Sequence, residues 1–359
     1  MPMLAESVDA VIGVDTHTDT HTASLIDRTG REIAITTVEA SPEGYTGLLD
    51  WATQQAPGPR LVWAVEGCRS HGIGLLRVLV AAGQEVVEAG RPQRAARRPG
   101  GKSDPADARQ AAGAVLAAKR HAQPRRDGDR EALRILLVAR EYANTTRTAA
   151  VNLFKSLLLT APDALRESLR RLSTPRQTAT CAVLRVNRRE PTEDRVRRQT
   201  LRTLAQRIRL LDKEIRANER QLRDLVEAVM PVLLDEPGIG PVSAANLLVA
   251  WSHPGRCRSE AAFASLAGVS PLEASSGRVT RHRLNRFGDR SLNRALHTIV
   301  NWRMMHGHEP TQNYLTRRRG QQRSDSEIRR CLKRYTARHL FRLMESAAGT
   351  ASSAAFSEL

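Results

Sequence analysis

The segment Gly100-Gly101-Lys102-Ser103-Asp104-Pro105-Ala106-Asp107-Ala108-Arg109 places two aspartates three positions apart at the start of a predicted helix. Residues i and i+3 share a helix face, so the carboxylates of Asp104 and Asp107 would point to one place. Oxygen ligands in that arrangement suit a hard divalent cation. For this segment taken alone, capping is the stronger explanation, because Asp104 as N-cap, Pro105 in the first turn and an acid at the third position also begin a helix well.

Two isolated acids earlier in the chain favour metal binding over helix capping. Asp15 ends the apolar run 10–14, and Glu66 ends the run 61–65. Strand ends of this kind are where open α/β sheets place their chemistry. Four acids from three separate elements are difficult to explain as caps. If they converge, their mutual repulsion requires a metal, and two ions about 4 Å apart are the arrangement expected for phosphoryl transfer.

Two polar residues near Asp15 are predicted to have other roles. His17 lies on the loop that follows the strand, and we expect it to be a hydrogen-bonding or substrate-side residue rather than a metal ligand. Asp19 lies four positions beyond the strand end and is expected to be solvated.

Residues 8–122 have the alternation of an α/β domain. Three strands are followed by alternating helices and strands, which is the order of a ribonuclease H-like fold. The predicted strands are 8–14, 21–26, 32–38, 61–66 and 85–89, and the predicted helices are 42–55, 71–82 and 105–119.

A resemblance to the DEDD-type insertion-sequence transposases is carried by three motifs in order, Gly13-Val14-Asp15-Thr16-His17, Val65-Glu66-Gly67 and Lys102–Arg109. The N-terminal domain of that family is similar to the Holliday-junction resolvase (RuvC-like) branch of the ribonuclease H-like fold. The resemblance implies that the catalytic, metal-binding acids are Asp15, Glu66, Asp104 and Asp107 and that the cofactor is Mg²⁺.

The composition indicates a nucleic-acid partner. The chain has 359 residues, enough for two domains, and a formal net charge of +18, which favours a polyanion as its counterpart. Only five of its 56 basic residues are lysine, and arginine is suited to bidentate phosphate contacts. Aromatic residues make up 4% of the chain, which favours recognition of the nucleic-acid backbone over stacking on unpaired bases.

The remaining composition bears on location. Four cysteines, at 68, 181, 257 and 331, lack C-x-x-C spacing, so they indicate reduced thiols rather than zinc ligands or disulfides. The N-terminus lacks a signal-peptide pattern, and no apolar run reaches membrane length. We expect a cytoplasmic, nucleoid-associated protein that has no membrane partner.

A basic loop, residues 90–99, immediately precedes the two aspartates of the first segment. It is predicted either as an arm that tracks phosphates beside the metals or as a solvated linker. The candidate nucleic-acid-binding residues in and just after it are Arg94, Arg97, Arg98 and Lys102.

Residues 123–230 are predicted to form a basic helical and coiled-coil region. Between Leu201 and Val229, apolar residues recur in alternating three- and four-residue steps that are interrupted at Asn218. This heptad pattern is typical of a coiled coil, in which one polar core position fixes the register. We expect it to contribute to a homo-oligomer, either a dimer or a tetramer. Pairing of two helices within one chain is the alternative.

Residues 231–346 are predicted to form a mostly helical C-terminal domain, and residues 347–359 a disordered tail. The segment Glu236–Ala245 resembles a helix-hairpin-helix turn, in which Gly238 and Gly240 would let backbone N–H groups approach a phosphate. A glycine-rich connection between two helices is the alternative.

A second candidate centre lies in the segment Gly268–Arg278. It resembles the C-terminal transposase domain of the same family, whose proposed nucleophile is a serine in a Pro-x4-Ser-Gly context. Counting from Pro271 assigns that role to Ser276, with Ser275 as the less favoured neighbour. Cations that could bind the scissile phosphate are Arg278, Arg281 and Arg283. Without the resemblance, the segment would be interpreted as a surface turn.

The coexistence of both motifs predicts a DNA transposase or recombinase with a composite site, in which Ser276 forms a covalent phosphoserine intermediate. The expected partner is double-stranded DNA, at the element ends and the target. The resemblance further implies a noncoding guide RNA that pairs with both. Two alternatives remain. A resolvase-type nuclease would use the four acids to hydrolyse DNA, and a non-catalytic nucleic-acid-binding protein would use them only structurally.

Overall fold

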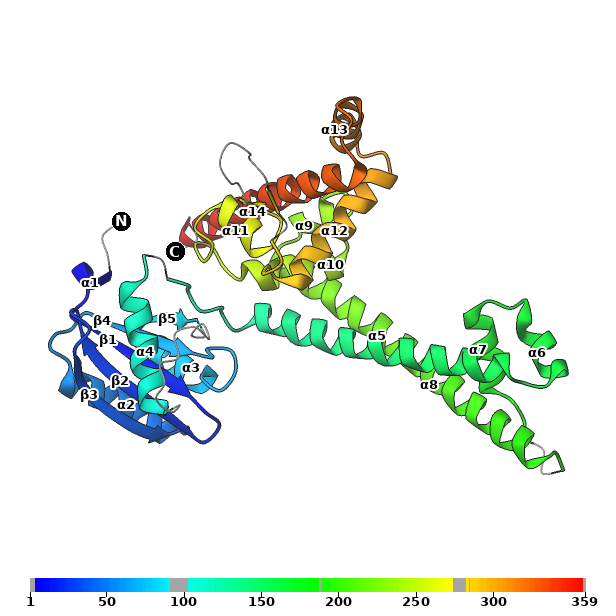
Figure 1. Cartoon of the computed structure of the whole chain (residues 1–359), viewed down its shortest axis with the longest axis horizontal. Coiled ribbons are helices and arrows are strands. Elements are labelled where there is room, and N and C mark those ends of the chain that lie inside the picture. Colours follow the sequence, from blue (N-terminus) through cyan, green and yellow to red (C-terminus); the bar gives the residue numbers. More distant parts are fainter. Residues whose placement is uncertain are drawn as a thin grey trace. The chain divides into compact units, whose positions relative to one another are not determined.

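The computed structural model describes residues 4–90, 103–119, 121–186, 189–273, 282–283 and 285–357. The chain divides into two compact units, Met1–Arg125 and Arg126–Leu359. Figure 1 labels most of their elements and colours the chain from the N-terminus to the C-terminus.

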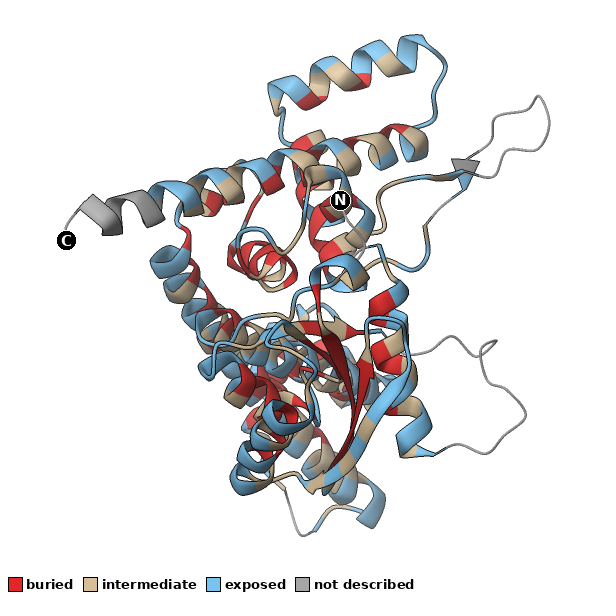
Figure 2. Ribbon diagram, turned by 90° about the vertical axis from the view of Figure 1, so that its left-hand side faces the viewer, coloured by how far each residue is buried: buried red, intermediate tan, exposed pale blue. Residues whose placement is uncertain are grey.

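The first unit is built on a five-stranded mixed sheet in the order β3-β2-β1-β4-β5. Its strands are β1 (Ala10–Thr16), β2 (Thr20–Asp27), β3 (Glu32–Glu39), β4 (Leu61–Glu66) and β5 (Glu85–Ala89). Strand β1 is antiparallel to β2 and parallel to β4. Every residue of β1 is buried, and the middle of the sheet is red in Figure 2. With helices on both faces, this sheet confirms the predicted ribonuclease H-like fold.

Alternation along the strands separates two hydrophobic cores. On one face, Ile12 and Val14 pack with α2 (Pro42–Gln55) and α3 (Ile73–Ala81). On the other face, Val11 packs with α4 (Asp104–Ala117), and α1 (Leu4–Ser7) contributes Leu4 at the edge of the same core. Side chains at odd positions of β1 therefore face α4.

Gly13 sets the distance between β1 and α4. A Cβ atom built on Gly13 would lie 2.0 Å from the carbonyl oxygen of Ala108 and 2.6 Å from the backbone nitrogen of Ala112. Only glycine permits this backbone approach. Because Asp104 precedes Ala108 by one helical turn and Asp15 follows Gly13 by two residues, the close contact brings the start of α4 to the carboxyl end of β1.

The second unit begins with a helical hairpin. The helices are α5 (Asp129–Leu159), α6 (Asp163–Arg170), α7 (Thr174–Ala182) and α8 (Thr192–Val229). Leu133, near the start of α5, shares a core with Leu222, near the end of α8. Phe154, near the end of α5, shares another core with Leu201, near the start of α8. The two long helices therefore pack antiparallel within one chain.

That pairing buries much of the heptad seam identified in the sequence. The side-chain amide of Asn218 donates to the carbonyl oxygen of Leu136 on α5 at 3.0 Å, so this polar residue marks a fixed register. The intramolecular alternative thus accounts for the heptad pattern in this chain. The homo-oligomer stays a prediction.

The rest of the second unit surrounds α10 (Pro241–Trp251). Its other elements are α9 (Val232–Asp235), α11 (Glu260–Leu266), β6 (Leu272–Glu273), β7 (His282–Arg283), α12 (Arg290–Met305), α13 (Glu309–Gly320) and α14 (Asp325–Ser357). Leu247, Phe263, Leu296 and Leu340 meet in its core. Helix α14 continues to Ser357, into the segment expected to be a disordered tail. The segment is rich in alanine, which favours a helix. Within the described ranges, no helix is long and apolar enough to cross a membrane.

Candidate metal centre

Asp15 carries a carboxylate into the buried end of β1. The residue is 7% exposed, because strands flank it on both sides and α4 covers the face to which it points. Its Oδ2 atom is buried, and the imidazole of His17 lies next to it. A buried carboxylate is costly to ionise unless a positive charge lies next to it, which His17 or a metal ion could supply.

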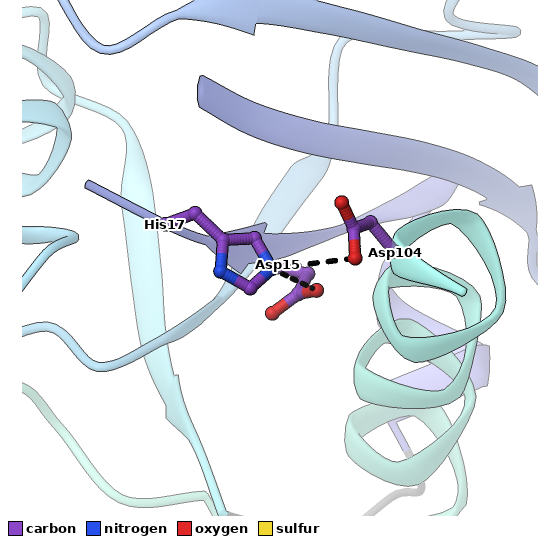
Figure 3. Close-up of side chains that lie close together, drawn as sticks. All are labelled: Asp15, His17 and Asp104. Carbon is purple, nitrogen blue, oxygen red and sulfur yellow. Dashed lines mark ion pairs between the residues drawn. The ribbon is translucent and has the colours of Figure 1, made fainter. Parts of the chain in front are cut away.

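His17 and Asp104 complete a cluster with Asp15. Nε2 of His17 lies 3.2 Å from Oδ2 of Asp15 and 3.3 Å from Oδ1 of Asp104; Figure 3 shows the imidazole reaching both carboxylates. The side chains of His17 and Asp104 are 44% and 47% exposed, against 10% for Asp15. The cluster is therefore shielded from solvent at Asp15, in the sheet, and accessible to solvent at His17 and Asp104.

Local backbone structure positions the side chains of His17 and Asp104 beside Asp15. The backbone N–H of His17 donates to the carbonyl oxygen of Thr20 at 3.0 Å, which closes the turn between β1 and β2. Asp104 is the first residue of α4, with Ser103 in the N-cap position. The sequence predicts Asp104 as the N-cap, but the N-cap is Ser103, one residue earlier. The Asp104 carboxylate pairs with His17 instead.

The electrostatics of Asp15 follow from its burial. Burial raises the pKa of Asp15 above its ordinary value; the charge of His17 opposes this, and the carboxylates of Asp107 and Asp104 add to it. Asp107 thus lies within electrostatic range of the cluster. Three acids acting on one small volume produce the repulsion that a cation relieves.

Glu66 lies at the neighbouring strand end. Val14 of β1 is in register with Val65 of β4, so the next residues along the two strands are Asp15 and Glu66. Strand alternation places Glu66 on the face of Val62 and Ala64, which is the face of α4. The hydroxyl of Thr16 donates to the carbonyl oxygen of Glu66 at 3.0 Å and ties the two strand ends together.

A turn directly after Glu66 explains the following glycine. Gly67 has a φ of 62°, in the left-handed region that favours glycine. A Cβ atom there would also lie 2.8 Å from Oγ of Ser70. The Val65-Glu66-Gly67 motif is therefore a strand end followed at once by a tight turn.

The donor set fits a divalent cation. Donor atoms of Asp15, His17 and Asp104 lie within 4.8 Å of one another, the span of one coordination sphere. Carboxylate oxygens suit Mg²⁺ and Mn²⁺, whereas an imidazole nitrogen is more typical of zinc, copper, iron and nickel sites. Asp107 and Glu66 lie outside this group of three; Asp107 acts on Asp15 through its charge, and Glu66 follows the residue in register with Val14.

His17 is the residue whose place in the cluster the sequence interpretation did not anticipate. One signal was available. In an extended chain, residues i and i+2 point to the same side, so a strand that continues past Asp15 carries His17 to the Asp15 side. The predicted strand ended at Val14, whereas β1 continues to Thr16.

The helix-hairpin-helix-like turn is held by charged groups. Arg303 donates to the carbonyl oxygen of Pro237 at 2.8 Å and to Glu236 at 2.7 Å. His339 contacts the other oxygen of Glu236 at 3.0 Å. The pKa of Glu236 is lowered, because His339 and Arg303 outweigh the opposing effect of its burial.

The two glycines of that turn differ. Gly238 has a φ of 82°, and a Cβ atom there would lie 2.8 Å from the indole of Trp302. Gly240 is the N-cap of α10 and has open space beside it. The preceding helix α9 has only four residues. Gly240 is thus the candidate for close approach of a ligand, and Gly238 serves the turn itself.

Several candidate residues lie outside the described residues, namely Arg94, Arg97, Arg98, Lys102, Ser276, Arg278 and Arg281. Strands β6 and β7 pair antiparallel, with Leu272 opposite Arg283 and Glu273 opposite His282. The segment 274–281, to which Ser276 belongs, therefore connects two paired strands. Arg283 itself is exposed.

Two family models match the chain. Residues 12–162 match a model for DEDD transposases of the IS110 type, described as a transposase. Residues 230–316 match the model described as Transposase IS116/IS110/IS902 family. No curated protein matches. The first match contains all four candidate acids, and the second contains the glycine turn and Ser276.

Proposed function

The chain belongs to the DEDD-type insertion-sequence transposases of the IS110 family, and from this premise we propose that it cuts and rejoins DNA through a Mg²⁺-dependent composite site and a phosphoserine intermediate. Enzymes of this family process DNA and use divalent metal ions. The observation that carries the proposal is the buried carboxylate of Asp15, which faces Asp104 across the contact between β1 and α4.

In the proposed site, Mg²⁺ is held by Asp15, Glu66, Asp104 and Asp107. When bound, the metal neutralises charge that develops on the phosphate and promotes ionisation of the attacking hydroxyl. Asp15 and Asp104 are prepositioned by the close packing at Gly13. His17 offsets the repulsion between them before metal binds and lies on the open side, where DNA would enter.

Ser276 is the proposed nucleophile. Its Oγ forms a bond to a DNA phosphorus atom, and the bond from that phosphorus to one deoxyribose oxygen breaks. The serine loses a proton and the leaving oxygen gains one, so no energy-rich cofactor is consumed. Attack by a hydroxyl of the recipient strand reverses these changes and rejoins the DNA. Arg278, Arg281 and Arg283 would bind the phosphate and stabilise its charge.

The proposed partners are double-stranded DNA at element ends and target, a noncoding guide RNA, and further copies of the chain as a dimer or tetramer. The net charge of +18 and the low aromatic content support contacts to nucleic-acid backbones, with sequence read by base pairing. The proposed location is the cytoplasm, in association with the nucleoid.

A hydrolytic nuclease of the resolvase type is the second candidate. The observation that favours it is that the whole acidic cluster lies within the first compact unit, so water could be activated there without any residue from the second unit. Such an enzyme would release free DNA ends.

An adduct assay separates the two functions. Purified protein with its co-purifying RNA, Mg²⁺ and end-labelled element-junction DNA is resolved under denaturing conditions. We expect a covalent protein–DNA band that is lost in Ser276→Ala and Asp104→Ala and kept in the matched control Ser275→Ala. Cleavage without an adduct, indifferent to both serine changes, would assign the hydrolytic function instead.

A further inference from the structure

Phe287 is an apolar side chain that the fold leaves in water. It is 93% exposed, more than any other large hydrophobic residue among those described; Tyr142 follows at 74%. The chain has only five phenylalanines. A phenyl ring with this exposure contributes almost nothing to folding, so its apolar character has no explanation in the stability of this unit.

The loop that carries Phe287 is fixed in place. The backbone N–H of Phe287 donates to the side chain of Asn285 at 3.0 Å, and Asn285 donates to the carbonyl oxygen of Ser265 at 3.3 Å. Gly288 lies so close to Gly268 that a Cβ on it would be 2.2 Å from the Gly268 nitrogen. The exposed ring is therefore presented from a rigid base.

The following residue anchors the other end of this loop. The N–H of Asp289 donates to the carbonyl oxygen of Leu266 at 2.7 Å, and its carboxylate caps α12 by accepting from the N–H of Leu292 at 2.9 Å. Asp289, the acid next to this loop, is thus engaged with the helix terminus. Its one negative charge offsets only part of the positive charge around the ring.

That charge consists of Arg283, Arg286 and Arg290, which are all exposed. None of the three forms an ion pair with another described residue. Burying unpaired guanidinium groups against an apolar protein surface is costly. A polyanion, in contrast, would pair with them while its flat apolar groups contact the ring.

We propose that Phe287 stacks on a base of the DNA that is bound along this arginine surface. Proximity in the chain supports this, because Phe287 lies four residues beyond β7, at the base of the β6–β7 hairpin whose connection includes Ser276. The ring holds a base next to the strand to be cut, and the arginines hold its phosphates. This inference rests on the proposed DNA-processing function and adds a contact that the four acids and Ser276 do not provide.

The test measures binding of fluorescently labelled duplex and single-stranded DNA of one sequence to the full-length protein, in EDTA. Removal of one stacking aromatic typically weakens binding about 5- to 150-fold. We expect a loss in that range for Phe287→Ala on at least one of the two probes. Phe287→Leu should bind as weakly as the alanine variant, because it keeps apolar area but has no flat face. Phe287→Trp should keep affinity, and the fluorescence that it adds should be quenched by DNA.

Two control measurements exclude a general effect of losing an exposed aromatic residue and a loss of folding. Tyr142→Ala removes an exposed aromatic residue from α5 and should leave binding unchanged. The thermal unfolding midpoint of Phe287→Ala should equal that of the wild type, because the side chain is already in water. Unchanged affinity of Phe287→Ala on both probes, full affinity of Phe287→Leu, or a change in oligomeric state in place of DNA binding would each overturn the proposal.

The assay is independent of the chemistry proposed above. Binding in EDTA requires neither bound metal nor Ser276. If Ser276→Ala retains adduct formation while Phe287→Ala loses affinity, the phosphoserine mechanism fails and the stacking contact stands. If Ser276→Ala loses the adduct while Phe287→Ala keeps full affinity, the phosphoserine mechanism stands and the stacking contact fails.

Discussion

Asp15 combines a buried position with a charge that its surroundings oppose. Its pKa is raised in the folded protein, first by burial and then by Asp107 and Asp104. A raised folded-state pKa means that the associated stability is fully present below the ordinary value of 3.8 and is lost as pH rises through the folded-state pKa. At neutral pH without metal, ionised Asp15 therefore destabilises the fold.

Asp15→Asn should for this reason raise the thermal unfolding midpoint in EDTA at neutral pH, while abolishing DNA joining. Scanning calorimetry across pH checks the first effect, and the stabilisation should vanish at pH values below the ordinary aspartate pKa. Asp50→Asn, an exposed change on α2, serves as control and should shift nothing. A destabilised Asp15→Asn protein at neutral pH would show that its neutral form is not the one favoured by the fold.

At the scale of elements, the packing of α4 on β1 depends on a single missing side chain. Gly13→Ala forces a methyl group against the Ala108 carbonyl oxygen, and overpacking of this kind costs about 1–3 kcal/mol even where neighbours can adjust. We expect a lower unfolding midpoint and weaker metal binding, because Asp104 moves away from Asp15. Calorimetry and Mn²⁺ titration measure the two effects.

Gly113→Ala is the matched control on the same helix. A methyl group there meets open space, and replacing glycine within a helix by alanine stabilises by about 0.5–1 kcal/mol. Opposite signs at the two positions would support the packing argument. Equal effects would contradict it.

Element types were predictable here because periodic patterns encode them directly. The helix 42–55 has the predicted bounds, and the third strand differs by one residue at its end. The sequence also allowed Asp15 and Asp104 to be predicted as members of one metal-binding set, because both lie at the ends of helices or strands. The contact of His17 with both carboxylates depends on a turn closed by Thr20 and on one rotamer, and neither leaves a periodic signal.

Pairing partners were less predictable for a physical reason. A heptad pattern specifies an apolar seam on α8 but not which helix covers it. The register that α5 supplies depends on contacts such as Arg147 with Asp212 at 2.5 Å and Asn218 with Leu136. These contacts join positions far apart in the chain, and neither helix alone indicates them.

At the scale of the whole molecule, each compact unit has its own hydrophobic core. The sheet of the first unit is packed on both faces, and the second unit is organised around α10 and the helical hairpin. The acidic cluster belongs entirely to the first unit. We therefore expect two thermal transitions, of which Mg²⁺ raises only one.

Ligand binding stabilises the state that it binds by about 2.7 kcal/mol at a concentration one hundred times the dissociation constant. Calorimetry with and without Mg²⁺ should show a shift of the first unit's transition alone, identified with a fragment of residues 1–125. Asp104→Ala should remove that shift. An equal shift of both transitions, or a single transition, would contradict independent units.

Gly13 has a further consequence on the timescale of generations. Glycine is the smallest residue, so every missense change in its codon adds at least one carbon atom where the backbone of α4 already lies. Copies of a mobile element drift in sequence once they are dispensable to their host. A copy with a replacement at this position should move less often although its reading frame is intact, because the change weakens both its fold and its metal site.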